Sequence, residues 1–178
     1  MKMIQNSACI VILSLFCLLN SSFAQNFPSD WAGKWQGNLA IYNPAKGKTM
    51  EVTMQLTITA TENPSQWGWE IVYNTGEKQD IRKYVLLAQD PAVGHYLIDE
   101  QNSILLDSYL VNQRLISAFD VSNNRLMAIY HFQPEQIVFT ILSSGGEYLR
   151  QSGGSNDTPL VDSFKLQAFQ EAVLKRIP

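Results

Sequence analysis

Cysteine is absent from this 178-residue chain beyond its first 17 residues, because Cys9 and Cys17 are the only two. The remainder can form no disulfide and offers no thiolate to a metal. With only His95 and His131 as histidines, a cysteine-based or multi-histidine zinc site is excluded. The chain also lacks the glycine-rich and serine motifs of P-loop, dinucleotide-binding and hydrolase sites. We therefore expect no metal, no cofactor and no catalytic centre.

Charge is sparse and no basic run occurs, so nucleic acid is not an expected partner. Long apolar runs are equally scarce. The sequence has one such run, ACIVILSLFCLL at residues 8–19. This run is shorter than the roughly 17–25 residues that a membrane span needs, which disfavours a transmembrane anchor. Lys2 before it and Ser22-Phe23-Ala24 after it complete the pattern of a secretory signal peptide. A lipoprotein signal is disfavoured, because Phe16 precedes Cys17 where a small residue belongs.

We accordingly expect residues 1–24 to be a cleaved signal peptide and residues 25–178 to form one domain, either periplasmic or secreted. Removal of Lys2 from 13 basic residues leaves 12 against 16 acidic residues, a net charge of −4. A domain of this length buries enough surface to fold without disulfides.

Alternation of apolar and polar residues dominates the rest of the chain. Residues 50–61 (MEVTMQLTITAT) place an apolar side chain at every second position, which is typical of a strand with one buried face. Turn signals such as NPAKG, NTGEK and SSGGE separate similar runs, as in a meander of antiparallel strands. The expected strands are 34–42, 48–61, 66–74, 80–89, 94–100, 103–111, 114–121, 125–132, 136–143 and 147–151.

The tail, residues 160–178, fits either a helix or a strand. The segment FQEAVLKR has helical propensity, yet an uncovered edge beside residues 34–42 would promote aggregation. A final strand that closes the sheet is therefore the narrowly preferred interpretation. The fold class predicted is all-β, a single antiparallel up-and-down barrel of 8–10 strands.

The segment WAGKWQGNLAIY at 31–42 has Gly33, Trp35 and Gly37 at alternate positions. Gly33-Lys34-Trp35 resembles the Gly-x-Trp signature on the first strand of the lipocalins and the wider calycin group. That resemblance implies a closed barrel around a cavity, with the tryptophan plugging its floor and a late basic residue packed on the indole. Arg150 and Arg176 both qualify for that basic residue. The lipocalin Thr-Asp-Tyr type segment has no counterpart here.

The end of the chain, FQEAVLKR, is also similar to the last strand of the nitrobindin-like haem-binding barrels, His-Leu-x-Ala-x-Leu-x-Arg. Phe169 stands where that family has its iron-ligating histidine. The resemblance therefore implies a terminal strand and no haem bound in that manner.

Polar residues concentrate in GHYLIDEQNSILLDSYL, residues 94–110, which should form a hairpin. A turn centred on Asn102 places His95 opposite Tyr109 and groups both with Asp99 and Asp107 on one face. Such a group suits proton transfer or the binding of a polar ligand. A two-residue turn at 101–102 instead moves His95 to the other face.

Three functions remain open from the sequence. The first is binding of a small apolar or amphipathic ligand without catalysis; its candidate residues are Trp35, Met54, Leu56, Trp69, Tyr73, His95, Asp107, Tyr109, Phe119, Tyr130 and Phe139. The second is a protein–protein module, or oligomer, that uses apolar strand faces near 114–132. The third is a calycin-like enzyme centred on His95 and Asp107, which requires His95 to point into a cavity.

Overall fold

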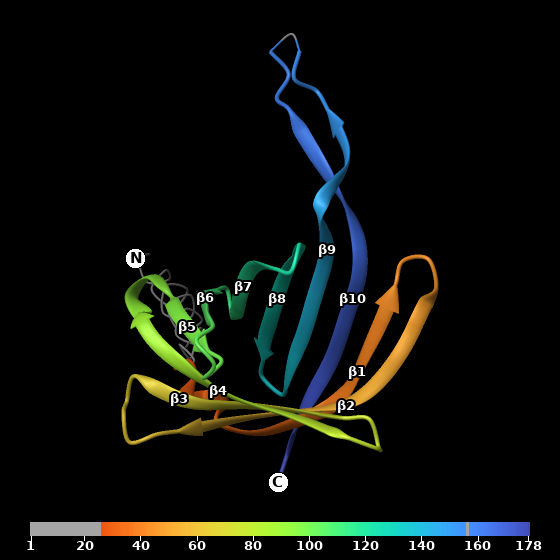
Figure 1. The fold of residues 1–178 in the computed structure, drawn as a ribbon. Coiled ribbons are helices and arrows are strands. Elements are labelled where there is room, and N and C mark those ends of the chain that lie inside the picture. The colour runs from red at the N-terminus through yellow and green to blue at the C-terminus, as the bar shows by residue number, and fades with distance from the viewer. Residues whose placement is uncertain (1–25, 156) are drawn as a thin grey trace, which may run out of the picture.

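The computed structural model describes residues 26–155 and 157–178, so the expected signal peptide and both cysteines lie outside the described residues. The described chain forms a closed barrel of ten antiparallel strands in which each strand pairs with its neighbours in sequence and the last strand pairs with the first (Figure 1). None of its helices has the length and apolar character needed to cross a membrane. The elements are η1 (Ser29–Trp31), β1 (Gly33–Asn43), β2 (Gly47–Ala60), β3 (Gln66–Asn74), β4 (Gln79–Asp90), η2 (Pro91–Val93), β5 (His95–Asp99), β6 (Leu105–Val111), β7 (Arg114–Val121), β8 (Asn124–Gln133), β9 (Gln136–Ser152) and β10 (Val161–Ile177).

The prediction of an all-β up-and-down barrel is therefore confirmed, and the tail is a strand. β10 pairs with β1 from Lys34 opposite Ile177 to Tyr42 opposite Phe169, which removes the open edge that β1 would otherwise expose. Phe169 lies against Tyr42, with 6.0 Å between ring centroids. It alternates with the buried Ala172 and Leu174 and so belongs to the outer face.

Gly37 is required by the close approach of β1 to β10. A Cβ atom at this position would lie 2.1 Å from the carbonyl oxygen of Val173, a distance that no side chain tolerates. Glycine in a strand interior commonly marks such an approach of two backbones. The alternating glycines of residues 31–42 thus allow the first and last strands to meet.

The floor of the barrel is packed with aromatic rings. Trp35 is 1% exposed, and its indole Nε1 donates to the carbonyl oxygen of Trp31 at 2.9 Å. Trp31 packs on Trp35 and on Phe132, and Phe27 closes the same end against Tyr96 and Phe132. Trp35 therefore plugs this end of the barrel.

The turn expected within residues 136–152 is absent from the structure. The sequence SSGGE predicts a turn between strands at 136–143 and 147–151, but β9 runs through it as one strand of 17 residues. The glycines instead serve a close contact, because a Cβ on Gly146 would lie 2.4 Å from Oδ1 of Asn123. The register between β9 and β10 shifts between Ser163 and Ala168, which lie opposite Arg150 and Ser143.

Candidate functional site

One half of the barrel interior is open. A cavity of about 580 Å³ lies between β1, β2, β3, β4, β8, β9 and β10. Its apolar wall consists of inward-facing residues near the strand ends opposite the floor: Leu39, Ile41, Met50, Val52, Leu126 and Ile141. Ligand sites of drug-sized molecules commonly have about 300–1,000 Å³. The space suits one small molecule.

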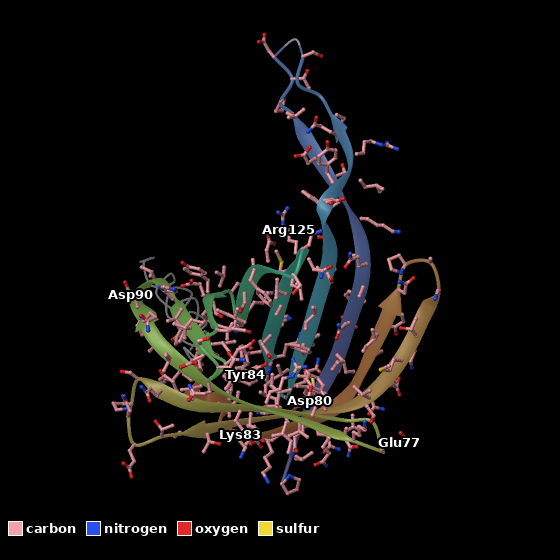
Figure 2. All side chains as sticks on the ribbon, viewed as in Figure 1. Glu77, Asp80, Lys83, Tyr84, Asp90 and Arg125 are labelled. Carbon is pink, nitrogen blue, oxygen red and sulfur yellow. The ribbon has the colours of Figure 1, made fainter. Side chains whose placement is uncertain are left out.

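Strand alternation builds this wall. β2 buries Val52, Met54, Leu56 and Ile58, while the residues between them face outward. The same period applies to β4, where Tyr84 and Lys83 lie on opposite faces of the ribbon (Figure 2). Along these stretches, the residues that enter the cavity follow from the parity of the buried ones.

A polar group lies on the wall of the cavity at β3 and β4. The Nε and Nη2 atoms of Arg82 donate to Oδ2 of Asp80 at 3.1 and 2.9 Å. The Arg82 guanidinium also lies over the ring of Tyr73, with 5.1 Å between its Cζ atom and the ring centroid. The other polar residues of the lining are Thr75, Lys78, Gln79 and Gln170. The site is therefore amphipathic, with one polar side and an apolar remainder.

The tyrosines of the interior are neutral at physiological pH. Burial raises the pKa of Tyr73 to about 12, against an opposing effect from Arg82. Burial also raises the pKa of Tyr84 and of Tyr130. Each phenol therefore keeps its proton and can donate a hydrogen bond to a ligand oxygen.

A smaller space of about 80 Å³ lies deeper in the barrel and shares Tyr73, Arg82 and Ile141 with the larger cavity. Tyr84, Glu100, Ser117 and Tyr130 add polar atoms to its wall. Beside it, Nε1 of the fully buried Trp69 has no hydrogen-bond partner. The polar side of the site thus continues inward from Arg82.

The predicted ligand-binding residues divide into three groups. Four of them fill the floor half of the barrel and are at most 1% exposed: Trp35, Met54, Leu56 and Trp69. Four others face the open space: Tyr73 lines both cavities, and Phe119, Tyr130 and Phe139 line the deeper one. The remaining three, His95, Asp107 and Tyr109, belong to the hairpin of β5 and β6.

The hairpin has the register that the sequence predicts for a turn centred on Asn102, with His95 opposite Tyr109 and Leu97 opposite Asp107. Nε2 of His95 lies 2.7 Å from Oδ1 of Asp107, and its ring stacks on Tyr109 with 4.9 Å between centroids. However, the alternate residues Tyr96 and Ile98 are the buried ones, so this cluster lies on the outer face.

The placement of His95, Asp107 and Tyr109 in a shared interior is therefore wrong. The Asp107 side chain is 66% exposed. The enzyme hypothesis required His95 to point into a cavity, and His95 points away from the barrel interior. Among residues 26–155 and 157–178, no group of three or more His, Cys, Asp or Glu side chains is arranged to hold a metal.

Sequence reasoning missed the polar wall formed by Asp80, Arg82 and Tyr84. The signal was present, because these residues share their parity with Leu86, which is fully buried. Polar residues at the end of a strand, on the face that is buried further along, indicate the open end of a barrel. The apolar wall residues Leu39, Ile41 and Val52 were missed because no aromatic ring distinguishes them.

The basic residue packed on Trp35 is Arg176 rather than Arg150. Its Cζ atom lies 4.2 Å from the centroid of the indole, and its Nη1 and Nη2 donate to the carbonyl oxygens of Ala32 and Asp30. This contact ties the entering segment of the chain to the last strand.

No protein-family model matches the sequence, and no curated protein matches it. Among solved structures, an S-type phycobiliprotein lyase, CPES from Guillardia theta, aligns over 83% of this chain and 88% of its own, with a TM-score of 0.53 and 10% identity. The likeness is one of fold. A protein of unknown function from the DUF3598 family of Nostoc punctiforme covers 84% of this chain and 48% of its own, with 12% identity and a TM-score of 0.46. The chain thus has a lipocalin-like barrel fold.

Proposed function

We propose that this protein is an exported barrel that binds one small apolar or amphipathic ligand in the open half of its interior, without catalysing a reaction. The cavity of about 580 Å³ carries this proposal, because one half of the barrel is packed solid while the other is left open. The sequence supports export through the signal pattern of residues 1–24.

The lining indicates how such a ligand lies. Its apolar body would contact Leu39, Val52 and Ile141. A hydrogen-bonding group would lie toward Arg82 and Tyr73, which face the same space. Burial of the apolar body supplies most of the affinity, and the polar wall fixes the orientation. We expect a dissociation constant on the order of micromolar.

A fluorescence titration tests the proposal. The probes are N-phenyl-1-naphthylamine, which is apolar, and biliverdin, chosen because the similar structure is a phycobiliprotein lyase. A Val52→Trp variant fills the cavity from β2, while Thr53→Trp adds the same side chain next to it on the opposite face. We expect one-to-one binding of at least one probe by the native protein and by Thr53→Trp, and at least a tenfold loss in Val52→Trp.

Thermal unfolding of both variants verifies that the barrel is intact. Equal binding by the native protein and both variants would place the ligand elsewhere and overturn the proposal. Failure of both probes to bind the native protein at millimolar concentration would also contradict it.

A further inference from the structure

The polar side of the site ends in the inner chamber, the space of about 80 Å³ that shares Arg82 with the larger cavity. This volume is that of about two or three water molecules, so the chamber can receive a group of only a few heavy atoms. Much of its wall is apolar or aromatic and includes Ala128 and Phe139. One functional group at the end of a ligand therefore fits there, whereas the body of the ligand does not.

Hydrogen-bond donors are concentrated around this chamber. The phenols of Tyr73, Tyr84 and Tyr130 line it, and each keeps its proton because burial raises its pKa. The edge of the Trp69 indole meets the Tyr130 ring, with 5.1 Å between the ring centroids. Among residues 26–155 and 157–178, Nε1 of Trp69 is the one buried side-chain nitrogen or oxygen without a hydrogen-bond partner. Such a donor costs about 1–3 kcal/mol, so an arrangement that supplies an acceptor is favoured.

The charges at the chamber disfavour an ionic group. Arg82 on β4 and Glu100 after β5 both line it, and their formal charges cancel. Two N–H groups of Arg82 already donate to the carboxylate of Asp80. An entering carboxylate would meet Glu100 and an entering ammonium would meet Arg82. Either ion would also lose its hydration in a largely apolar space, which is costly for a charge without a partner.

We propose that the inner chamber receives an uncharged carbonyl group at one end of the ligand, whose oxygen accepts a hydrogen bond from the phenol of Tyr130. This inference rests on the proposed ligand binding and names the chemistry of the ligand's polar end. A carbonyl oxygen has two lone pairs, so one of the other two phenols can supply a second hydrogen bond. The ligand therefore lies with its carbonyl innermost and its apolar remainder in the larger cavity.

The unpartnered indole N–H of Trp69 explains why an acceptor is preferred. Burial raises the pKa of the Tyr130 phenol, and the nearby indole N–H opposes part of that rise. When the phenol of Tyr130 donates its proton to a carbonyl, the lone pairs of its oxygen remain free to accept from Nε1 of Trp69. A carbonyl thus satisfies both donors, whereas a ligand group that can only donate satisfies neither.

Calorimetric titration at neutral pH tests the charge preference with three ligands of equal carbon number: 2-decanone, decanoate and decylammonium. We expect 2-decanone to bind one-to-one and at least about tenfold more tightly than either ion, because each ion loses hydration in the chamber. Failure of 2-decanone to bind, or equal binding by an ion, would overturn the carbonyl assignment and leave cavity binding intact where another probe binds. If N-phenyl-1-naphthylamine and biliverdin also failed, the proposed function itself would be contradicted.

A pair of phenol deletions separates the hydrogen bond from the greater apolar character of the ketone. Tyr130→Phe keeps the ring and removes the donor, so the affinity for 2-decanone should fall about fivefold. Tyr109→Phe is the matched control, because Tyr109 is 48% exposed on the outer face, and its affinity should stay within about twofold of the native value. Thermal unfolding verifies that both variants keep the barrel. An unchanged affinity in Tyr130→Phe would overturn the assigned donor.

The two methyl groups of 2-decanone report its orientation through nuclear Overhauser effects. We expect the methyl group beside the carbonyl to contact Ala128, which lines the inner chamber but not the larger cavity. The methyl group at the other end should contact Val52, which lines the larger cavity but not the chamber. The reverse pattern would show the carbonyl near the mouth and would overturn the proposal.

Discussion

The guanidinium of Arg176 lies over the indole of Trp35, with 4.2 Å between its Cζ atom and the ring centroid. This contact joins the first strand to the last at the floor of the barrel, and the same guanidinium hydrogen-bonds to two backbone carbonyls of the entering segment. One side chain thereby links the last strand to the entering segment and packs on the tryptophan that plugs the floor.

Replacement of Arg176 by Met should destabilise the barrel by about 2 kcal/mol, because the cation–π contact and two charge-assisted hydrogen bonds are lost. Urea unfolding measures the change. Lys34→Met is the control, since Lys34 is exposed on the outer face of β1 and should change stability by less than about 0.5 kcal/mol. Equal effects of the two substitutions would mean that Arg176 is an ordinary surface cation.

Gly37→Ala should be among the most damaging single substitutions, with a cost of about 3 kcal/mol, because the new Cβ would clash with the Val173 backbone. Gly68→Ala provides a matched control in a strand, since its nearest neighbour is 3.6 Å away, an ordinary contact distance. We expect Gly68→Ala to stay within about 0.5 kcal/mol of the native stability. A tolerated Gly37→Ala would refute the close approach of β1 and β10.

Ser108 and Ser117 form a buried hydroxyl pair between β6 and β7, with 2.7 Å between their Oγ atoms. Either single Ala variant should cost about 1–2 kcal/mol, because it removes the hydrogen bond between the two buried hydroxyls, although Ser108 keeps its bond to the carbonyl oxygen of Leu106. The double variant removes both hydroxyls, and its cost should fall below the sum of the two singles. A strictly additive double-mutant cycle would mean that the two hydroxyls do not interact.

Stability should fall at alkaline pH because burial raises the pKa of Tyr73 to about 12. An unfolded tyrosine ionises near pH 10, so the folded state holds its proton where the unfolded state releases it. The stabilising contribution is fully present below about pH 10 and is lost as the pH rises from there toward 12. Urea unfolding at pH 8, 10 and 11 should show this decline, and Tyr73→Phe should reduce it. An unchanged decline in Tyr73→Phe would assign the effect to other groups.

The fold was predictable because alternation and turn chemistry are local. Residues 50–61 determine an inward and an outward face without reference to any other strand, and most predicted strand limits match the structure within a few residues. The SSGGE segment was misinterpreted, because a glycine needed for close approach has the same sequence signature as a glycine needed for a turn. That distinction depends on Asn123, which the local pattern of SSGGE does not reveal.

The site was less predictable because register alone does not assign the faces of a strand. The pairing of His95 with Tyr109 was one of the two registers that the sequence left open, and Leu97 between His95 and Asp99 left both faces of β5 partly apolar. Only the closed barrel decides that Tyr96 and Ile98 point inward. Likewise, Trp69 and Tyr73 share a parity, yet Trp69 is enclosed while Tyr73 borders the cavity, because they lie at different heights in the barrel.

Intermolecular nuclear Overhauser effects from a bound probe test most directly whether the ligand lies inside the open half of the barrel. N-phenyl-1-naphthylamine, or biliverdin if that is the probe that binds, is added to protein with labelled methyl groups. We predict effects to Ile41, Val52 and Ile141, which line the cavity. Effects confined to Met127 and Leu142, which line a second pocket of about 650 Å³ beside β7, β8, β9 and β10, would contradict binding in this cavity.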